Sequence, residues 1–396
     1  METKTKTYRG AISVTFITMF FIGGGNIMLS ATKEALMSHF SVGLFEIGIL
    51  FTIRGIVSGL VPIICGSLSD RFGRKAIILI GGLLYIGYYI LVPRSTDFSS
   101  MYFLIVLFSV AYSFVDPAGM AILFDAMPNP TPAVPFIQVF FASGAVFAPL
   151  VASTVMQMGK PWQITYYFYA GLSLAMCLYI FFIKFPPTVG SKNKASAKSY
   201  FEFAIEPKPL REGLLIFIFA VCNSMVFNVI TNWTDIYMKD IFNFPAAEAI
   251  KVLSYIQIGG VLGAFFMSRV SRKMSATNIL RIWPVCSLST LILALFMPTS
   301  LMFIICIMLT SFTAGCMFSV VVGYSGMLFY KNSGASTGAV SSATAAGIAV
   351  SSLISGRLIG MLGVRNVFFV MCTFGVISII LAQVIHFRHG KLIKRS

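Results

Sequence analysis

This sequence is unusually poor in charged residues. Only 11% of its 396 residues are Asp, Glu, Lys or Arg, whereas a soluble domain carries roughly 25%. Hydrophobic residues make up 57%, and the mean hydropathy is +0.88. This composition excludes a soluble enzyme and predicts a protein that lies in a membrane.

Groups that hold metals or do chemistry are also scarce. The three histidines (His39, His386 and His389) do not occur with carboxylates at metal-ligand spacing. The seven cysteines lie inside apolar runs without a CxxC pair, so we interpret them as small core hydrophobes. We find no nucleotide-binding loop, paired catalytic carboxylates or Ser/His/Asp arrangement. We therefore expect no metal, no cofactor and no enzyme activity.

Long apolar runs dominate the chain. A helix that crosses a bilayer takes about 20 apolar residues, and twelve segments meet this length. They are 10–31, 45–69, 76–93, 101–124, 133–157, 162–185, 213–238, 248–268, 277–297, 301–329, 335–359 and 366–387. The sequence therefore predicts an all-α membrane protein with twelve transmembrane helices and no large domain outside the bilayer.

The basic residues are distributed unevenly between the two sides of these helices. With a cytoplasmic N-terminus, 21 of the 29 Lys and Arg residues lie on the cytoplasmic side and seven, Lys33 among them, on the other. Arg54 alone falls deep inside a span. The positive-inside rule then places both termini in the cytoplasm of a cytoplasmic (inner) membrane protein. This topology explains the net charge of +16 without nucleic acid.

The chain divides at its longest polar stretch. We predict a six-helix bundle over 1–185, a cytoplasmic linker over 186–212 and a second six-helix bundle over 213–396. The segment Arg71-Phe-Gly-Arg-Lys75 returns 198 residues later as Arg269-Val-Ser-Arg-Lys273. This echo indicates two pseudo-symmetric bundles, related by an axis along the membrane normal.

One motif carries a resemblance to a known family. Gly66-Ser-Leu-Ser-Asp70-Arg71-Phe-Gly73-Arg74-Lys75, between the second and third spans, closely resembles the G-x-L-a-D-r-x-G-r-k loop of the major facilitator superfamily. The resemblance implies the twelve-helix fold of that family and secondary transport by alternating access.

The resemblance also implies a gating role for this loop. Asp70 is expected to cap the start of the eleventh span, and Asp125 to pair with Arg74, in a charged latch between the two bundles. The expected gating residues are Gly66, Asp70, Arg71, Gly73, Arg74, Lys75 and Asp125. The alternative is that these charges belong to an ordinary solvated loop.

Two intramembrane charges are candidates for transport chemistry. A charge at mid-membrane costs at least about 2.5 to 3.5 kcal/mol, so Arg54 is expected to face a wet cavity and bind an anionic substrate. Asp116, in the fourth span, is the candidate proton carrier. The alternative for Arg54 is a structural pair with Asp116 or with a helix-end carbonyl, and the alternative for Asp116 is structural pairing.

Polar side chains within apolar spans complete the candidate site. Ser224, Asn228, Asn232 and Asp235 repeat at helical spacing and form one stripe on the seventh span. We expect this stripe to line the cavity, with hydrogen bonding between helices as the alternative. Further candidates for substrate binding are Asn26, Tyr112, Gln138, Gln257 and Tyr324. Small residues over 336–355 favour close helix packing.

These observations predict a monomeric secondary transporter. The expected cargo is a small polar or anionic metabolite, such as an organic acid or a sugar-like compound, moved by proton-coupled symport. Proton-coupled efflux of amphipathic drugs is the alternative. The efflux alternative is weakened because the fourth span lacks the arginine of many antiporters in this superfamily. In addition, the segment from Gly144 to Ser153 matches the motif of those antiporters only in part. A membrane-embedded enzyme or sensor is a more distant alternative.

Overall fold

The computed structural model describes residues 9–126, 134–185, 206–329 and 333–392. Over these ranges the chain is helical and contains no strand. Twelve candidate membrane spans lie within them, so the predicted all-α fold with twelve transmembrane helices is confirmed.

Helices α2 to α7 span Arg9–Phe40, Leu44–Phe72, Arg74–Leu91, Phe98–Ala126, Val134–Gln157 and Gln163–Phe182. Helices α8 to α14 span Leu214–Phe242, Ala246–Val270, Ala276–Leu295, Ser300–Ala314, Met317–Leu328, Ser333–Leu362 and Val364–Leu392. Two short helical turns, Val92–Arg94 and Pro209–Gly213, precede α5 and α8.

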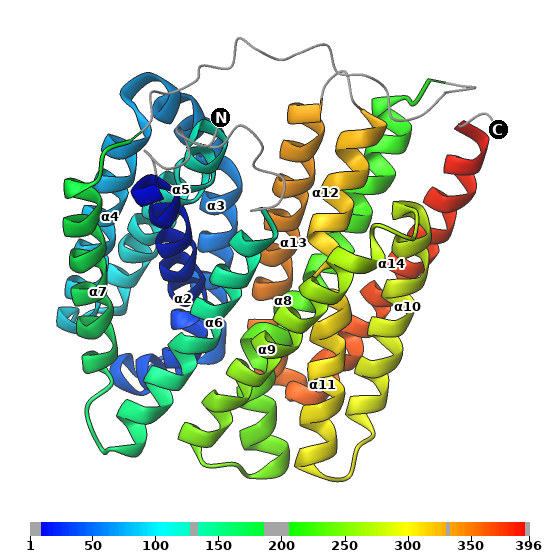
Figure 1. Cartoon of the computed structure of the whole chain (residues 1–396). Coiled ribbons are helices and arrows are strands. Elements are labelled where there is room, and N and C mark those ends of the chain that lie inside the picture. Colours follow the sequence, from blue (N-terminus) through cyan, green and yellow to red (C-terminus); the bar gives the residue numbers. More distant parts are fainter. Residues whose placement is uncertain (1–8, 127–133, 186–205, 330–332, 393–396) are drawn as a thin grey trace.

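The helices form two groups that stand side by side. Figure 1 shows α2 to α7, the N-terminal half, on the left and α8 to α14, the C-terminal half, on the right. Helix α2 begins and α14 ends at the same end of the molecule, which we call the termini end; the opposite end is the far end. The proposed linker lies largely outside the described residues, so the domain boundaries stay a prediction.

Two predicted spans differ from the structure. The first is expected to end at residue 31, but α2 continues to Phe40. The polar residues after 31 therefore belong to a helix and not to a loop. The tenth, expected as one helix over 301–329, is broken at Gly315 and Cys316 into α11 and α12. Glycine in a helix interior is unfavourable by roughly 1 kcal/mol relative to alanine, which favours a break at this position.

The core of the N-terminal half is built from tyrosines and glycines. Tyr85, Tyr89 and Tyr169 are fully buried around Phe21, and the rings of Phe21 and Tyr85 meet edge to face at 5.0 Å. A Cβ added to Gly24 would lie 2.4 Å from the Tyr169 hydroxyl oxygen. Glycine at this position of α2 therefore makes room for the aromatic core.

The two halves approach most closely where α3 packs on α13. A Cβ on Gly48 would lie 2.7 Å from the carbonyl oxygen of Ser352, and a Cβ on Gly356 would lie 2.9 Å from the Cα of Gly48. Side chains larger than hydrogen would separate these helices. The expectation that small residues of the eleventh span serve close packing is confirmed for this contact.

The cysteines are mostly core residues, as expected, with one exception. Six are buried, but Cys286 is exposed on α10. Ile282 and Val285 are also exposed on this helix, at 42% and 40%. In a membrane-spanning helix, an exposed apolar face contacts lipid, so a thiol is as suitable there as in the core.

Candidate functional site

Arg54 contacts Asn26 in the interior of the N-terminal half. Its guanidinium Nη1 donates to the Asn26 backbone carbonyl oxygen at 2.7 Å, and Nη2 donates to the Asn26 side-chain oxygen Oδ1. The arginine is half-buried, and its guanidinium carbon lies 6.0 Å from the Phe108 ring centroid. The structure thus brings two of the predicted substrate-binding residues together, from α2 and α3.

Asp116 and Tyr112 lie one turn apart on α5, which packs against α3. Both are half-buried, and Tyr112 is within electrostatic range of both Arg54 and Asp116. Among the described residues, neither a hydrogen bond nor an ion pair is formed by Asp116. The alternative of a direct Arg54–Asp116 pair is therefore not what this conformation shows.

The polar stripe of α8 is engaged in contacts with other helices. The Asn228 amide donates to the hydroxyls of Ser351 and Ser352 on α13, each at 2.9 Å. The Asn232 amide donates to the Asn228 side-chain oxygen at 2.6 Å, and Ser30 of α2 donates to Asn232. In this conformation the stripe forms hydrogen bonds between helices, and its role as a cavity lining stays a prediction.

The same stripe ends in an ion pair that the sequence analysis misses. Lys33 of α2 donates its ammonium protons to both carboxylate oxygens of Asp235, and the two side chains are 0% and 2% exposed. The sequence places Lys33 in a loop on the outer side and makes Arg54 and Asp116 the main intramembrane charges. The loop assignment of Lys33 is wrong because α2 extends past residue 31 and carries Lys33 into the interface with α8. Lys33 and Asp235 thus add a charged pair to Arg54 and Asp116, whose roles stay predictions.

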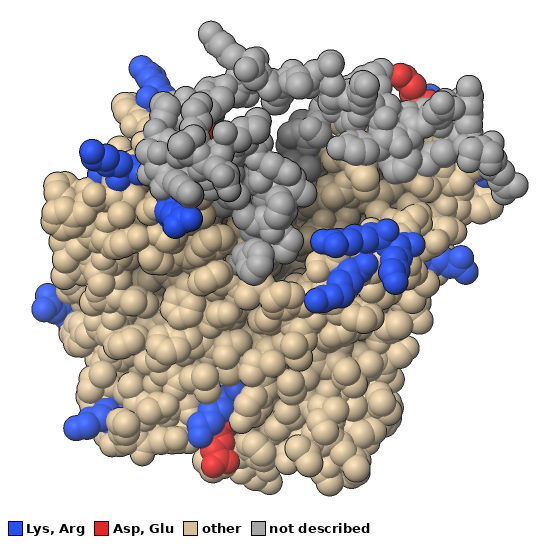
Figure 2. Space-filling view, viewed as in Figure 1, with Lys and Arg blue, Asp and Glu red and all other residues tan. Residues whose placement is uncertain are grey.

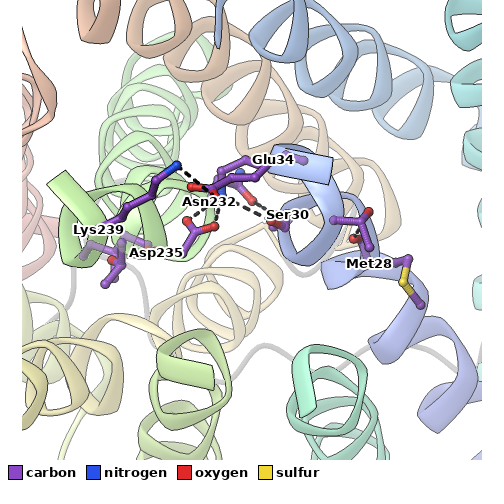
Figure 3. A network of polar contacts seen from close by, with 10 residues as sticks. Met28, Ser30, Glu34, Asn232, Asp235 and Lys239 are labelled. Atoms are coloured by element: carbon purple, nitrogen blue, oxygen red, sulfur yellow. Dashed lines mark hydrogen bonds and ion pairs between the residues drawn. The ribbon is translucent and has the colours of Figure 1, made fainter. Parts of the chain in front are cut away.

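A second ion pair lies next to the first, closer to solvent. The Lys239 ammonium of α8 is 3.2 Å from the Glu34 carboxylate of α2, and 48% of the Lys239 side chain is exposed. Figure 3 shows Ser30 and Glu34 on one helix facing Asn232, Asp235 and Lys239 on the other. The two helices therefore present opposite charges to each other across the boundary between the halves.

A spacing in the sequence matches these contacts. On α2, Asn26, Ser30 and Lys33 repeat at i, i+4 and i+7. On α8, Asn228, Asn232 and Asp235 have the same spacing, and each lies 202 positions after its counterpart on α2. Ser30 and Lys33 each contact the residue 202 positions later. These contacts thus join corresponding positions of the two repeats. This matched stripe is the signal that could have identified Lys33.

Other hydrogen bonds between the halves involve α6 and α9 as well as α3 and α13. Ser153 donates to the Ala247 carbonyl at 2.6 Å, and Ser254 to the Val146 carbonyl at 2.8 Å. Thr52 donates to the Ala349 carbonyl at 3.1 Å. Ser153, near the end of α6, and Ala247, near the start of α9, lie at the far end, where Figure 1 shows these helices converging. The halves are therefore joined from the middle of the molecule to its far end.

Toward the termini end, a cavity of about 560 Å³ lies between α6 and the C-terminal half. Its lining includes the predicted residues Gln138 and Tyr324 together with His389. The Tyr324 hydroxyl lies 3.2 Å from the His389 Nδ1. The predicted residue Gln257 is half-buried on α9 and does not line this cavity. Apart from Gln257, the candidate residues thus fall into three separate places: the interior of the N-terminal half, the α8 interface and this cavity.

The loop motif holds helices of the N-terminal half together. Gly73 adopts φ +88°, a conformation that glycine accepts readily, and so permits the tight turn between α3 and α4. The Arg74 Nε lies 3.0 Å from the Asp125 carboxylate of α5, so the expected pair is present. The Lys75 ammonium donates to the Phe181 carbonyl at 2.7 Å, and Arg71 is exposed. The side chain of Asp70 and the environment of Gly66 lie outside what the structure describes, and the latch between the halves stays a prediction.

The architecture of the helices defines a class of membrane protein. A helical membrane protein with two matched halves, joined at one end and enclosing polar residues, has the architecture of an alternating-access transporter. The family description for the Major Facilitator Superfamily matches residues 15–300. The chain therefore belongs to the Major Facilitator Superfamily and is a secondary transporter rather than an enzyme.

Curated relatives are similar along most of the chain. The uncharacterized MFS-type transporter YfkL of Bacillus subtilis (strain 168) is 22% identical over 381 residues, covering 95% of this chain and 96% of YfkL. The inner membrane transport protein YdiN of Escherichia coli (strain K12) is 27% identical over 270 residues, which covers 67% of this chain and 62% of YdiN.

Solved transporter structures share the fold. The nucleoside transporter NupG, as a point mutant, superposes with a TM-score of 0.77 at 14% identity, covering 95% of this chain and 98% of NupG. A bacterial homologue of the human lysosomal transporter Spinster, in an inward-facing and unoccupied conformation, also gives 0.77, at 13% identity and 98% coverage of both chains. At these identities the comparisons establish the fold alone.

Proposed function

We propose that this transporter moves a small polar or anionic metabolite across the cytoplasmic membrane by proton-coupled symport. The observation that carries the proposal is Arg54, a half-buried cation in the interior of α3. Within the part of the chain that the structure describes, no carboxylate forms an ion pair with it. Its fixed fork of N–H donors suits a carboxylate or a phosphate.

Asp116 is the proposed proton carrier. It lies in the same half as Arg54, is half-buried, and has its charge unmatched by a hydrogen bond or ion pair among the described residues. A carboxyl in that position can change protonation without first breaking an ion pair. Substrate bound at Arg54 would lie close enough to influence this change through Tyr112, which is near both groups.

We infer that the termini end faces the cytoplasm. In Figure 2, more of the Lys and Arg side chains lie in the upper part of the view, on the side of the termini. Labelling with a membrane-impermeant thiol reagent tests this in a Cys286→Ser background. Ser271→Cys, at the termini end of α9, should react only from the cytoplasm, and Ser99→Cys, at the start of α5, only from outside. The reverse pattern would overturn the sidedness.

Efflux of amphipathic drugs remains the second candidate because of the cavity at the termini end. Its lining includes Phe265, Met267, Met274 and Met327, and flexible methionines suit varied apolar ligands. An export assay with a lipophilic cation separates the two functions. Export that survives Arg54→Gln would favour efflux over uptake of an anion.

The decisive test of symport begins with a substrate. A thermal-shift screen of the purified protein against a metabolite library should identify compounds that stabilise it, since a ligand at 100 times its Kd stabilises by about 2.7 kcal/mol. Proteoliposomes should then accumulate that compound under an imposed proton gradient. Asp116→Asn should abolish accumulation but preserve exchange of internal for external substrate. Accumulation by Asp116→Asn would contradict the coupling role.

A further inference from the structure

Two cations are anchored to the same face of α2. The Lys33 ammonium donates to the Ser30 backbone carbonyl at 3.1 Å, and the Arg54 guanidinium donates to the Asn26 backbone carbonyl at 2.7 Å. These carbonyls are four residues apart, which is about 6 Å along a helix axis and nearly the same face. Two positive groups from α2 and α3 therefore approach one stretch of helix, one turn apart.

The two cations differ in what neutralises them. Lys33 is fully buried and has the carboxylate of Asp235 as its counter-ion. Arg54 is half-buried and has no carboxylate partner among the residues described. A guanidinium has five N–H donors, and the contacts with Asn26 use two nitrogens. Arg54 thus keeps donors for a further acceptor.

The counter-ion of Lys33 belongs to the other half. Asp235 is on α8, whereas Lys33, Asn26 and Arg54 all belong to the N-terminal half. When the halves part at the far end, Asp235 moves away with α8 and Lys33 stays beside Ser30. Lys33 then needs a new acceptor because an unpaired charge is costly in a low-dielectric interior.

We propose that Lys33 and Arg54 form one anion-binding site on α2, whose Lys33 side is occupied by the Asp235 carboxylate in this conformation. Asp235 acts as a built-in substitute for one anionic group of the cargo. Because the two cations are anchored to carbonyls about one helical turn apart, such a site selects a compact dianion, such as a dicarboxylate or a phosphate monoester, over a monoanion. This assignment rests on the proposed function, and it narrows the substrate class.

Chemical rescue tests the site without a known substrate. Asp235→Ala removes the carboxylate and leaves Lys33 with space for a small anion. The apparent melting temperature of the purified variant should fall by about 5 °C or more. At constant ionic strength, acetate should restore part of this loss, and malonate, with two carboxylates, should restore more. Asp240→Ala, which removes an exposed acid from the same helix, is the matched control and should show no anion response.

Two double variants assign the response to the two cations. Lys33→Met/Asp235→Ala should lose the response to both anions. Arg54→Gln/Asp235→Ala should keep the response to acetate and lose the advantage of malonate. Equal effects of the two anions on Asp235→Ala, or equal responses in all variants, would overturn the proposal. Asp235→Ser, which also leaves space for an anion beside Lys33 but keeps a polar group on α8, gives the same comparison if the alanine variant does not fold.

The outcome is independent of the transport assay. Rescue without any proton-driven uptake would leave the anion site standing and refute symport. Proton-driven uptake of a neutral compound, together with no anion rescue of Asp235→Ala, would refute the anion site and leave symport standing. Both results are readable because the rescue experiment measures binding and stability alone.

Discussion

Among the described residues, two ion pairs in which both side chains are at most 10% exposed differ in what they join. Arg74 and Asp125 connect α4 with α5 inside the N-terminal half, and their side chains are 10% and 6% exposed. Lys33 and Asp235 connect α2 with α8 across the boundary between the halves. A pair inside one half is preserved when the halves move as rigid bodies, whereas a pair across the boundary exists in one conformation only. Position relative to the boundary, rather than burial, therefore predicts which pair a movement of the halves would break.

The surroundings of the pair at the boundary support this distinction. The Lys33 ammonium lies 5.7 Å from the Trp233 ring centroid, and the Trp233 indole donates to Ser355 of α13 at 2.7 Å. Phe51 of α3 contacts the same ring edge to face at 5.9 Å. Helices α2, α3, α8 and α13 thus meet around one ion pair. Parting the halves must break the contacts of Lys33 and Phe51 with Trp233, whereas the Trp233–Ser355 hydrogen bond lies within the C-terminal half and can persist.

The largest expected effect comes from removing one charge of the boundary pair. Lys33→Met leaves Asp235 buried without a counter-ion, which costs about 3 to 5 kcal/mol. Thermal unfolding of the purified variant should show this loss, and Lys33→Met/Asp235→Asn should recover most of it. If the double variant were as unstable as the single one, the pair would not be the origin of the effect.

The pair inside one half should affect stability without affecting conformation. Asp125→Asn weakens a charged hydrogen bond to Arg74 and should cost about 1.5 to 3 kcal/mol. Alkylation of Thr52→Cys, whose position contacts Ala349 across the boundary, reports opening at the far end. Its rate should be unchanged by Asp125→Asn and increased by Lys33→Met/Asp235→Asn. An increase with Asp125→Asn would show that this pair also controls the gate.

Packing at the boundary should act in the same direction as charge. A Cβ on Gly356 would press against α3 near Gly48, and overpacking of this kind costs about 1 to 3 kcal/mol. Gly356→Ala should therefore raise the alkylation rate of Thr52→Cys. Gly360→Ala on the same helix has open space around its Cβ and serves as the control. Equal rates in the two variants would contradict the close α3–α13 contact.

The smallest effect is expected at the exposed pair of the boundary. Lys239→Gln removes the partner of Glu34, but half of the Lys239 side chain is exposed. Exposed ion pairs contribute about 0.2 to 1 kcal/mol and are screened by salt. Thermal unfolding should show a small loss at low salt that disappears at high salt. A loss that persists in high salt would indicate that this pair is as important as Lys33–Asp235.

The fold was predictable because a bilayer imposes simple length and hydropathy requirements. Those requirements identified every span, and the small residues of the eleventh span indicated its close packing. The length and hydropathy requirements misplaced Lys33, because a charge after an apolar run resembles the end of a span. Hydropathy cannot distinguish a charge in a loop from one neutralised by a distant residue. The stripe on α8 was visible, but the predicted first span ended at residue 31, so it included Asn26 and Ser30 and left out Lys33.

The site was only partly predictable for a related reason. Arg54 and Asn26 were each recognised as polar residues in apolar surroundings, and the structure brings them together. Gln138 and Tyr324 were found by the same criterion, but they line a separate cavity. Polarity within a span shows that a side chain needs a partner. It does not show which partner, because that depends on helix packing between residues far apart in the sequence.

The measurement that tests alternating access most directly is a reversible cross-link at the far end. Ser153→Cys/Ala247→Cys, in a Cys286→Ser background, places two thiols where Ser153 now contacts the Ala247 carbonyl. Oxidation should form a disulfide and stop uptake of the compound found by the thermal-shift screen, and reduction should restore it. Thr290→Cys/Thr310→Cys joins two helices of one half, at hydroxyls 3.0 Å apart, and its oxidation should leave uptake intact. Undiminished uptake by the oxidised Ser153→Cys/Ala247→Cys protein would contradict opening at the far end.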